Sequence, residues 1–317
     1  MTVTNYSPRI ALGTWSWGSG VAGGDQVFGN HLSEAELEPV VKAAMAKGLN
    51  LWDTAAVYGQ GSSERILGSL LASYNREDYT LSTKFTPQIA GPEDDAMERM
   101  LDGSLQRLHS DYIDLYWIHN PADVEKWTPG LIPLVKSGKV KRVGVSNHNL
   151  SQIRRAREIL AAGGVELSAI QNHYSLLYRS SEEAGILDYC MKNGIEFFAY
   201  MVLEQGALTG HYTSVNPLPA GSGRAATYNA ALPNLERLYQ AMAKIGNGHG
   251  ASIPEVATAW AINKGTLPII GVTKLHYIDS QERASSIILK PDEISLLERL
   301  ASESGVDTRG SWENPMA

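Results

Sequence analysis

The chain has 317 residues, of which 43% are hydrophobic and 19% are charged. This balance is typical of a folded globular protein and excludes a mainly disordered one. The formal net charge of −7 provides no basic field that would attract phosphate groups, so we expect neither a nucleic acid nor a membrane as a partner. The single cysteine, Cys190, excludes an intramolecular disulfide framework. Because the first ten residues contain no apolar signal-peptide segment, we expect a cytoplasmic protein.

Short β-branched or aromatic runs alternate with longer amphipathic runs along the whole chain. This rhythm is typical of repeated βα units that build a parallel sheet. The cores of the predicted strands are Ile10–Gly13, Leu51–Asp53, Thr80–Lys84, Ile113–His119, Arg142–Ser146, Ala169–Gln171, Glu196–Tyr200 and Leu267–Gly271.

Two of the amphipathic runs begin with a recognisable helix start. Ser33 precedes Glu36 by three residues, and Ser252 precedes Glu255 by the same interval. In a capping box of this kind the two side chains satisfy backbone N–H groups that have no partner inside the helix. We therefore predict helix starts directly after Ser33 and Ser252.

Eight strands that alternate with helices, without a break in composition, predict one closed (β/α)₈ TIM barrel that spans residues 1–317 as a single domain. The alternative is a doubly wound sheet, which has a glycine-rich turn after its first strand. Gly18, Gly20 and Gly23 do fit the spacing G-x-G-x-x-G. However, no helix of sensible length follows directly, and no acidic residue stands at a clear strand end about twenty residues further on.

Two segments are too long to be simple connections. Residues 14–31 are rich in glycine and contain Trp15, Trp17 and Phe28, and residues 203–231 are rich in glycine and proline. Loops longer than about 12–15 residues in compact domains are usually functional. We expect both loops at the C-terminal face of the barrel, and we expect residues 203–231 to form a lid that swings rather than packs.

The polar residues at the C-terminal ends of the strands form an uncommon set, and this is where the active site of such a barrel lies. They are Asp53, Lys84, His119, Asn147 and Gln171, with Tyr58 five residues after Asp53. Each of them alone has an ordinary structural explanation, such as a helix cap or a core histidine. An acid, a base, a phenol and an imidazole at neighbouring strand ends are difficult to explain together by packing.

The stretches NLWDTAAVYG, LSTKF, SLQRLHSDYIDLYWIHNP, KRVGVSNHNL, AIQNHYSLL and IIGVTK resemble the aldo-keto reductase superfamily. They occur in the family's order over almost the whole chain. The resemblance implies a (β/α)₈ barrel, a nicotinamide cofactor that is bound without a Rossmann domain, and reversible reduction of a carbonyl group.

By this resemblance Tyr58 is the general acid, Lys84 and Asp53 are its supporting pair, and His119 lies beside the substrate carbonyl. A free tyrosine has a pKa near about 10, which is too high for easy proton delivery at neutral pH. We expect the ammonium group of Lys84 to lower the pKa of the phenol. His119 can donate a hydrogen bond to the carbonyl oxygen as negative charge develops there.

The resemblance also implies an NADP(H) site. By the resemblance, the amide groups of Asn147 and Gln171 bind the nicotinamide carboxamide, and Ser146 assists them. Tyr200 stacks on the nicotinamide ring, and Lys274 neutralises the ribose 2′-phosphate. The other cofactor contacts that it implies are Gly13, Thr14, Trp15, Asp53, Met201, Val202, Leu203, Gln205, Gly206, Gly271, Val272, Thr273 and Gln281.

Three features depart from the family pattern. Met201 and Val202 stand where many relatives carry a Ser-Pro or Gly-Pro pair, and Gln281 stands where many carry an asparagine. Glu204 adds a carboxylate to the loop that is expected to hold the pyrophosphate. It would repel that group unless its side chain points away or pairs with a cation.

The expected substrate is a small-molecule carbonyl or alcohol compound, such as an aldehyde, a ketone or a sugar. Its contacts are predicted to be Trp15, Trp17, Tyr58 and His119, and Phe28, Phe85 and Trp117 could add to an aromatic pocket. No metal is expected, because Asp53, His119 and His148 do not complete a ligand set. We expect a monomer or a small homo-oligomer. The alternative function is that of an NADPH-binding regulatory module that resembles the β subunits of voltage-gated potassium channels.

Overall fold

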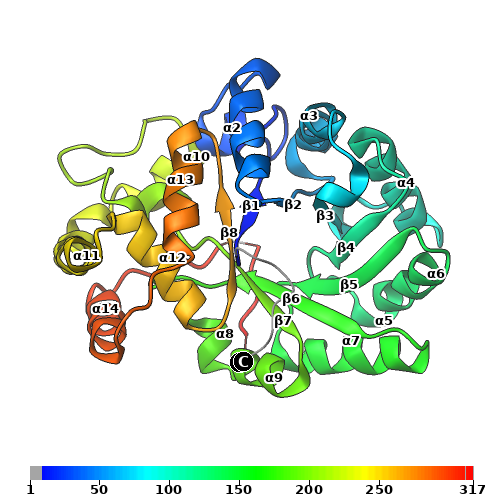
Figure 1. Ribbon diagram of the computed structural model, residues 1–317. Helices are drawn as coiled ribbons and strands as arrows, with labels where there is room; N and C mark the ends of the chain where they lie inside the picture. The colour runs from blue at the N-terminus through cyan, green and yellow to red at the C-terminus, as the bar shows by residue number, and fades with distance from the viewer. Residues whose placement is uncertain (1–8, 311, 317) are drawn as a thin grey trace.

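Eight parallel strands form a closed barrel in which each strand pairs with the next and the last pairs with the first (Figure 1). The computed structural model describes residues 9–310 and 312–316, so the first eight residues, on which the expectation of no signal peptide largely depends, lie outside it. The strands are β1 (Ala11–Gly13), β2 (Leu51–Asp53), β3 (Thr80–Phe85), β4 (Ile113–Ile118), β5 (Val140–Ser146), β6 (Leu167–His173), β7 (Glu196–Tyr200) and β8 (Leu267–Gly271). The prediction of a (β/α)₈ barrel is confirmed.

The helices lie around the outside of the barrel (Figure 1). The α-helices are α1 (Gly24–Phe28), α2 (Glu34–Ala46), α3 (Ser62–Leu71), α4 (Ala96–Leu108), α5 (Val124–Trp127), α6 (Leu131–Lys136), α7 (Leu150–Ala162), α8 (Ser180–Glu183), α9 (Ile186–Asn193), α10 (Gly223–Tyr228), α11 (Glu236–His249), α12 (Ile253–Asn263), α13 (Leu275–Ala284) and α14 (Pro291–Glu303). The 3₁₀ helices are η1 (Tyr58–Gly61), η2 (Arg76–Asp78), η3 (Pro87–Ile89), η4 (Thr128–Gly130), η5 (Glu204–Thr209) and η6 (Leu232–Leu235).

Both predicted capping boxes are present. The Ser33 side chain accepts from the backbone N–H of Glu36 and the Glu36 carboxylate accepts from that of Ser33, at the start of α2. Ser252 and Glu255 form the same reciprocal pair at the start of α12. These two helix starts are therefore fixed by local sequence, as predicted.

The interior of the barrel is filled by a small cluster of side chains from the strands. Trp117 and Phe198 meet edge to face in it, with ring centroids 5.2 Å apart. A Cβ atom on Gly144 of the neighbouring strand would lie only 2.3 Å from the Trp117 ring, so only glycine leaves room for this indole. A larger core lies between the barrel and the helices.

The segment 203–231 differs from the expected lid that swings rather than packs. Its side chains form a core of their own, in which Leu218, Ala225 and Tyr228 are buried against Ala207 and Leu232. Most residues from 213 to 221 are exposed or half-buried. The glycine and proline content therefore predicts the loop but not its packing, which depends on apolar residues scattered between the glycines.

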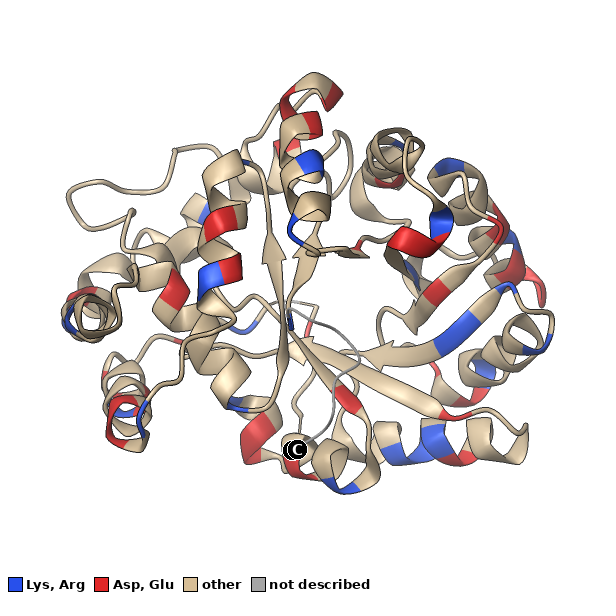
Figure 2. Ribbon diagram, in the orientation of Figure 1, with Lys and Arg blue, Asp and Glu red and all other residues tan. Residues whose placement is uncertain are grey.

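Charged residues of both signs are interspersed along the outer helices (Figure 2). Several of them pair between elements, as Lys139, directly before β5, does with Glu98 and Asp102 of α4. Exposed pairs of this kind each contribute at most about 1 kcal/mol. In the described residues no helix is both long enough and apolar enough to cross a membrane.

Candidate active site

A cavity of about 1030 Å³ opens at the C-terminal end of the barrel. Every strand contributes to its lining a residue near its C-terminal end or directly after it. These residues are Gly13, Asp53, Thr86, His119, Ser146, Gln171, Tyr200 and Gly271. The topology thus gathers on one surface the strand-end side chains that are far apart in the sequence.

A buried ion pair lies at the base of this cavity. The Lys84 Nζ atom lies 2.6 Å from Asp53 Oδ2 and 2.6 Å from the Thr54 carbonyl oxygen. Asp53 Oδ1 accepts from Ser82 Oγ at 2.7 Å and from Gln171 Nε2 at 3.2 Å. The two charges compensate each other, and the hydrogen bonds hold both side chains in place. The described residues contain no group of three or more His, Cys, Asp or Glu side chains that could hold a metal ion.

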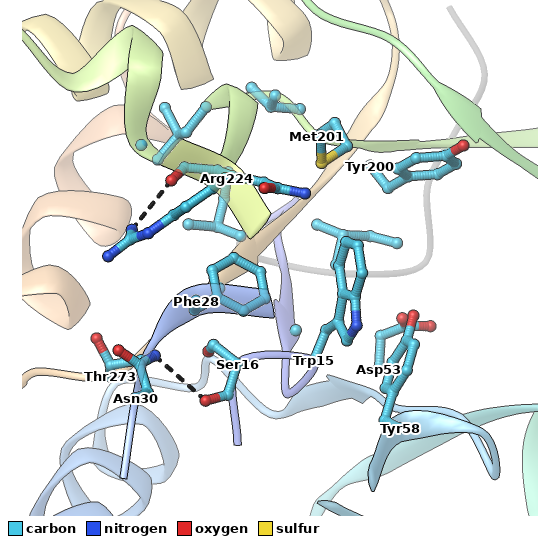
Figure 3. Close-up of a pocket in the computed structure, with 18 of the residues that line it drawn as sticks. Trp15, Ser16, Phe28, Asn30, Asp53, Tyr58, Tyr200, Met201, Arg224 and Thr273 are labelled. Carbon is cyan, nitrogen blue, oxygen red and sulfur yellow. Dashed lines mark hydrogen bonds between the residues drawn. The ribbon is translucent and has the colours of Figure 1, made fainter. Parts of the chain in front are cut away.

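Tyr58 stands next to this pair on a tight turn. The turn needs glycine at position 59, where a Cβ atom would lie 2.1 Å from Ser62 Oγ and the backbone has a φ of 55°. The Lys84 Nζ atom lies 5.2 Å from the centroid of the Tyr58 ring. Figure 3 shows Tyr58 beside Asp53 and Trp15.

The expectation that Lys84 lowers the pKa of Tyr58 is wrong for this structure. Burial, together with the negative charge of Asp53, raises the pKa of the phenol well above its ordinary value. The physical reason is that the phenol is buried and lies close to the Asp53 carboxylate, and both conditions disfavour the negatively charged phenolate. The phenol therefore keeps its proton at neutral pH, which is the state that a proton donor needs.

His119 lies across from Tyr58, with ring centroids 5.8 Å apart. Burial, together with the charge of Lys84, lowers the pKa of His119 well below its ordinary value, so the imidazole is neutral. Its Nδ1 atom lies 2.9 Å from Thr86 Oγ1. When the Thr86 hydroxyl donates to Nδ1, the other ring nitrogen, Nε2, carries the hydrogen and can donate it.

The amide of Asn147 is held by its neighbours. Asn147 has a left-handed backbone with a φ of 62°, and its Nδ2 donates to the His119 carbonyl oxygen at 2.9 Å. Its Oδ1 lies 2.6 Å from the Tyr200 hydroxyl oxygen. Ser146 Oγ lies 3.3 Å from the same Nδ2 atom. Asn147 and Gln171 both line the cavity, so their amide groups are oriented next to the space where a ligand would lie.

The loop after β7 lines the cavity with Met201, Val202, Leu203, Gln205 and Gly206. The Glu204 side chain of the same loop turns away from the cavity and is completely buried. It pairs there with His173. Burial opposes the charge of that histidine, but Glu204 and Glu313 outweigh it and raise its pKa to about 9. The Glu204 carboxylate therefore both points away from the cavity and pairs with a cation, the two conditions under which it does not repel a pyrophosphate.

The far end of the cavity is formed by the segment after β8. Gly271, Thr273, Lys274 and Gln281 line it there, and Lys274 is exposed. Thr258 Oγ1 donates to Gln281 Oε1 at 3.1 Å, which fixes the longer amide that replaces the family's asparagine.

Several predicted contacts do not reach the cavity. Trp17 is completely buried, packs on Trp52 with ring centroids 5.9 Å apart, and donates from Nε1 to the Val272 carbonyl oxygen at 2.7 Å. The prediction that Trp17 contacts the substrate is therefore wrong. Other predicted site or pocket residues are also buried away from the lining: Thr14, Lys84, Phe85, Trp117 and Val272. Lys84 nevertheless lies directly behind Tyr58.

The large cavity-lining side chains that the sequence-based prediction missed include Arg224 and Trp312. Arg224 donates from Nη1 to the Gln205 carbonyl oxygen at 3.1 Å, and its guanidinium lies 5.8 Å from the centroid of the Phe28 ring (Figure 3). Among the described residues it forms no ion pair, and its Nε atom is buried without a hydrogen-bond partner. The sequence signal that could have indicated Arg224 is its position in the long segment 203–231, which follows the β7 strand.

Aromatic rings form one wall of the cavity around Trp15. The Trp15 ring is stacked near Tyr58 with centroids 5.7 Å apart and an interplanar angle of 23°. It meets Phe28 edge to face at 5.3 Å and Trp312 edge to face at 6.1 Å. Aromatic walls of this kind suit flat rings and the apolar faces of sugars.

Comparisons with known proteins agree with this geometry. The pyridoxal reductase of Arabidopsis thaliana, named as chloroplastic, is 31% identical over 310 residues and covers 93% of this chain and 83% of its own. An aldo-keto reductase of Strobilurus tenacellus is also 31% identical, with 93% of this chain and 90% of its own covered.

Solved structures match as well. An aldo-keto reductase of Klebsiella pneumoniae in complex with NADPH is 26% identical and superposes with a TM-score of 0.72, covering 92% of this chain and 90% of its own. A glycerol dehydrogenase of Gluconobacter oxydans is 25% identical, with a TM-score of 0.76 and 96% and 94% covered. The model of the aldo/keto reductase family matches residues 9–302. This chain therefore belongs to the aldo/keto reductase family.

Proposed function

We propose that this protein is an NADPH-dependent reductase that converts the carbonyl group of a small aldehyde or ketone to an alcohol, and that it can run the reaction in reverse. The observation that carries this proposal is the placement of a protonated Tyr58 and a neutral His119 beside the buried Lys84–Asp53 pair in one cavity. These are the groups that a carbonyl oxygen needs when it gains negative charge and then a proton.

The residues that line the cavity suit a dinucleotide. At one end, Asn147 and Gln171 offer the donor and acceptor atoms that a carboxamide requires, and the Tyr200 ring lies beside them. At the other end Lys274 is exposed and forms no ion pair with a described residue, so it is available to a 2′-phosphate.

Arg224 supplies a test of this fit. Its buried Nε atom has no hydrogen-bond partner among the described residues, and buried polar groups are normally paired. An anionic group between the β7 loop and α10 would satisfy it. NADPH, when bound, supplies the hydride, and the solved NADPH complex of the family member from Klebsiella pneumoniae supports this choice of cofactor.

The protein's own part in the reaction is to move one proton and to stabilise one charge. As hydride reaches the carbonyl carbon, the carbonyl oxygen gains negative charge, and the hydrogen on the His119 ring stabilises that charge. The Tyr58 hydroxyl gives its proton to the same oxygen, so that the products are an alcohol and the oxidised cofactor. The Lys84 ammonium, held by Asp53, stabilises the tyrosinate that is left behind.

The aromatic wall of Trp15, Phe28 and Trp312 favours a carbonyl compound that carries a flat ring. The relative that is 31% identical and named pyridoxal reductase makes pyridoxal one member of the substrate panel that we propose. Aliphatic aldehydes and open-chain sugars complete that panel.

The test is multiple-turnover oxidation of NADPH, followed by absorbance, with each carbonyl compound of the panel. Sustained turnover with at least one compound, and loss of that turnover in Tyr58→Phe, is the expected result. NADPH binding without turnover of any carbonyl compound would instead support the regulatory module that was considered as the alternative.

A further inference from the structure

A buried histidine connects two carboxylates from distant parts of the chain. His173, the last residue of β6, lies with Nε2 2.9 Å from Glu204 Oε1 and with Nδ1 2.9 Å from Glu313 Oε1. All three side chains have 0% exposure. The imidazole ring is also stacked on Tyr178, with centroids 4.3 Å apart. This network therefore joins the barrel to the β7 loop on one side and to the C-terminal segment on the other.

At one end of the network, Glu204 fixes the loop that lines the cavity. Its carboxylate accepts hydrogen bonds from Ser175 Oγ, from Thr308 Oγ1 at 2.9 Å and from the Tyr228 hydroxyl at 2.8 Å. Its backbone has a φ of 46°, a left-handed conformation that is strained for a residue other than glycine. A strained backbone persists only when its surroundings over-determine it, and here the side-chain bonds do so.

At the other end, Glu313 reaches the predicted nicotinamide contacts. Its Oε1 atom lies 2.6 Å from the Tyr200 hydroxyl, which in turn lies 2.6 Å from Asn147 Oδ1. The preceding residue, Trp312, donates from Nε1 to the same hydroxyl at 3.3 Å and lines the cavity. The Tyr200 hydroxyl has one hydrogen for these two acceptor oxygens, so a displacement of Glu313 changes the contact that the hydroxyl makes with the Asn147 amide.

We propose that Glu313 is a positioning residue of the active site, which couples the docking of the C-terminal segment to cofactor binding through Tyr200 and Asn147 on one side and through His173 and Glu204 on the other. The inference rests on the proposed function, because it concerns the same NADPH site. The family match ends at residue 302, so Glu313 lies beyond the part of the chain that the family model describes.

The network has a charge balance that makes each member depend on the others. Glu204 and Glu313 bring two negative charges, and the protonated His173 between them brings one positive charge. Removal of one partner from a buried charged network leaves the others with unsatisfied charge or hydrogen bonds. A change at Glu313 is therefore transmitted to Glu204 and Tyr200 rather than absorbed locally.

The experiment measures NADPH affinity by fluorescence titration in the full-length protein. The variants are Glu313→Gln, Tyr200→Phe and the double variant, because phenylalanine keeps the ring of Tyr200 and removes only the hydroxyl. Asp307→Asn is the matched control, since it is the same acid-to-amide change at an exposed position of the same segment. We expect each single variant to weaken NADPH binding about tenfold. The double variant should bind NADPH at most about twofold more weakly than either single variant, because both changes break the same connection.

Amide exchange provides a second readout that a purely structural role would not change. The Gly310 N–H donates to Glu313 Oε2 at 3.0 Å. In the wild type, NADPH should slow exchange in C-terminal peptides that contain Gly310, and in Glu313→Gln it should not. This comparison remains valid for a variant with lowered thermal stability, because exchange is compared in the same protein with and without NADPH.

The two ways of failing are distinguishable. If the wild type binds no NADPH, the proposed function is overturned, and the coupling with it. If the wild type binds NADPH and Glu313→Gln binds it within about twofold as tightly, the coupling alone is overturned. Fully additive losses in the double variant would likewise overturn it.

Discussion

Tyr58 is held in the protonated state by its surroundings, and this defines the first test at the residue scale. We predict that Tyr58→Phe lowers kcat by about 10²- to 10⁴-fold, the usual contribution of a positioned acid. NADPH affinity should change by less than about twofold, because the phenol lies at the reacting carbonyl rather than on the cofactor. Steady-state kinetics and fluorescence titration measure the two quantities. A variant that keeps more than about a tenth of the wild-type kcat would exclude Tyr58 as the acid.

Lys274 decides which cofactor is preferred. It is exposed at the far end of the cavity and forms no ion pair with a described residue, so it is available to a phosphate group. We predict that Lys274→Ala weakens NADPH binding about tenfold and leaves NADH binding nearly unchanged. Lys244→Ala, an exposed change on α11 outside the cavity lining, serves as the control. Equal losses for both cofactors would contradict this role.

Site residues at the ends of strands were predictable from the sequence. Asp53 is the last residue of β2, Lys84 is the last but one of β3, and His119 directly follows β4, so closure of the barrel brings them together. The prediction for Trp17 was wrong because the chain turns after Thr14, with the Trp17 N–H bonded to the Thr14 carbonyl oxygen at 2.9 Å. In a strand, Trp15 and Trp17 would point to the same face because side chains alternate with a period of two, but in a turn they do not.

At the scale of elements, the segment 203–231 can now be divided into parts with different expected behaviour. We predict that NADPH slows amide exchange in η5 and α10, because the β7 loop and Arg224 border the cavity. Exchange at the exposed tip around residues 214–217 should change little. Hydrogen exchange with mass spectrometry compares the peptides, with α7 as an internal control on the outside of the barrel. Equal exchange in η5 with and without NADPH would contradict this prediction.

The strands were predictable because each is a short apolar run between turn residues, and this pattern is local. The extension of β6 to His173 was not, since it comes from pairing with Tyr200 of β7. The packing of the loop after β7 was not predictable either. The buried position of Glu204 depends on His173 and Thr308, which are 31 and 104 residues away in the sequence.

At the scale of the whole molecule, closure of the barrel supports the proposal that residues 1–317 act as one domain. The strand β8 pairs with β1, so the two ends of the barrel segment depend on each other. The C-terminal segment adds a second closure, because Glu313 and Thr308 reach back to β6 and to the β7 loop. The alternation of strands and helices in the sequence predicts the closure of the barrel. The docking of the C-terminal segment depends on polar contacts that leave no periodic pattern in the sequence.

The second closure makes stability depend on pH. Burial opposes the charge of His173, but the carboxylates of Glu204 and Glu313 outweigh it and raise the pKa to about 9, from an ordinary value of 6.5. Tyr178 and Tyr200 face the same ring. Because the folded-state pKa is the higher one, the contribution is fully present below about pH 6.5 and is lost as the pH rises through about 9. The difference corresponds to about 3 kcal/mol of unfolding free energy.

We therefore predict that the free energy of unfolding, measured by urea denaturation, falls between about pH 7 and pH 10. A His173→Gln variant can still form hydrogen bonds but cannot titrate, so the decrease should be smaller in it by about 3 kcal/mol. Glu293→Gln, which removes the carboxylate beside the half-exposed His249 on another face, should leave the decrease as in the wild type. The same decrease in His173→Gln as in the wild type would show that His173 carries no charge in the folded protein. It would also remove the electrostatic reason for the C-terminal segment to stay docked on the barrel.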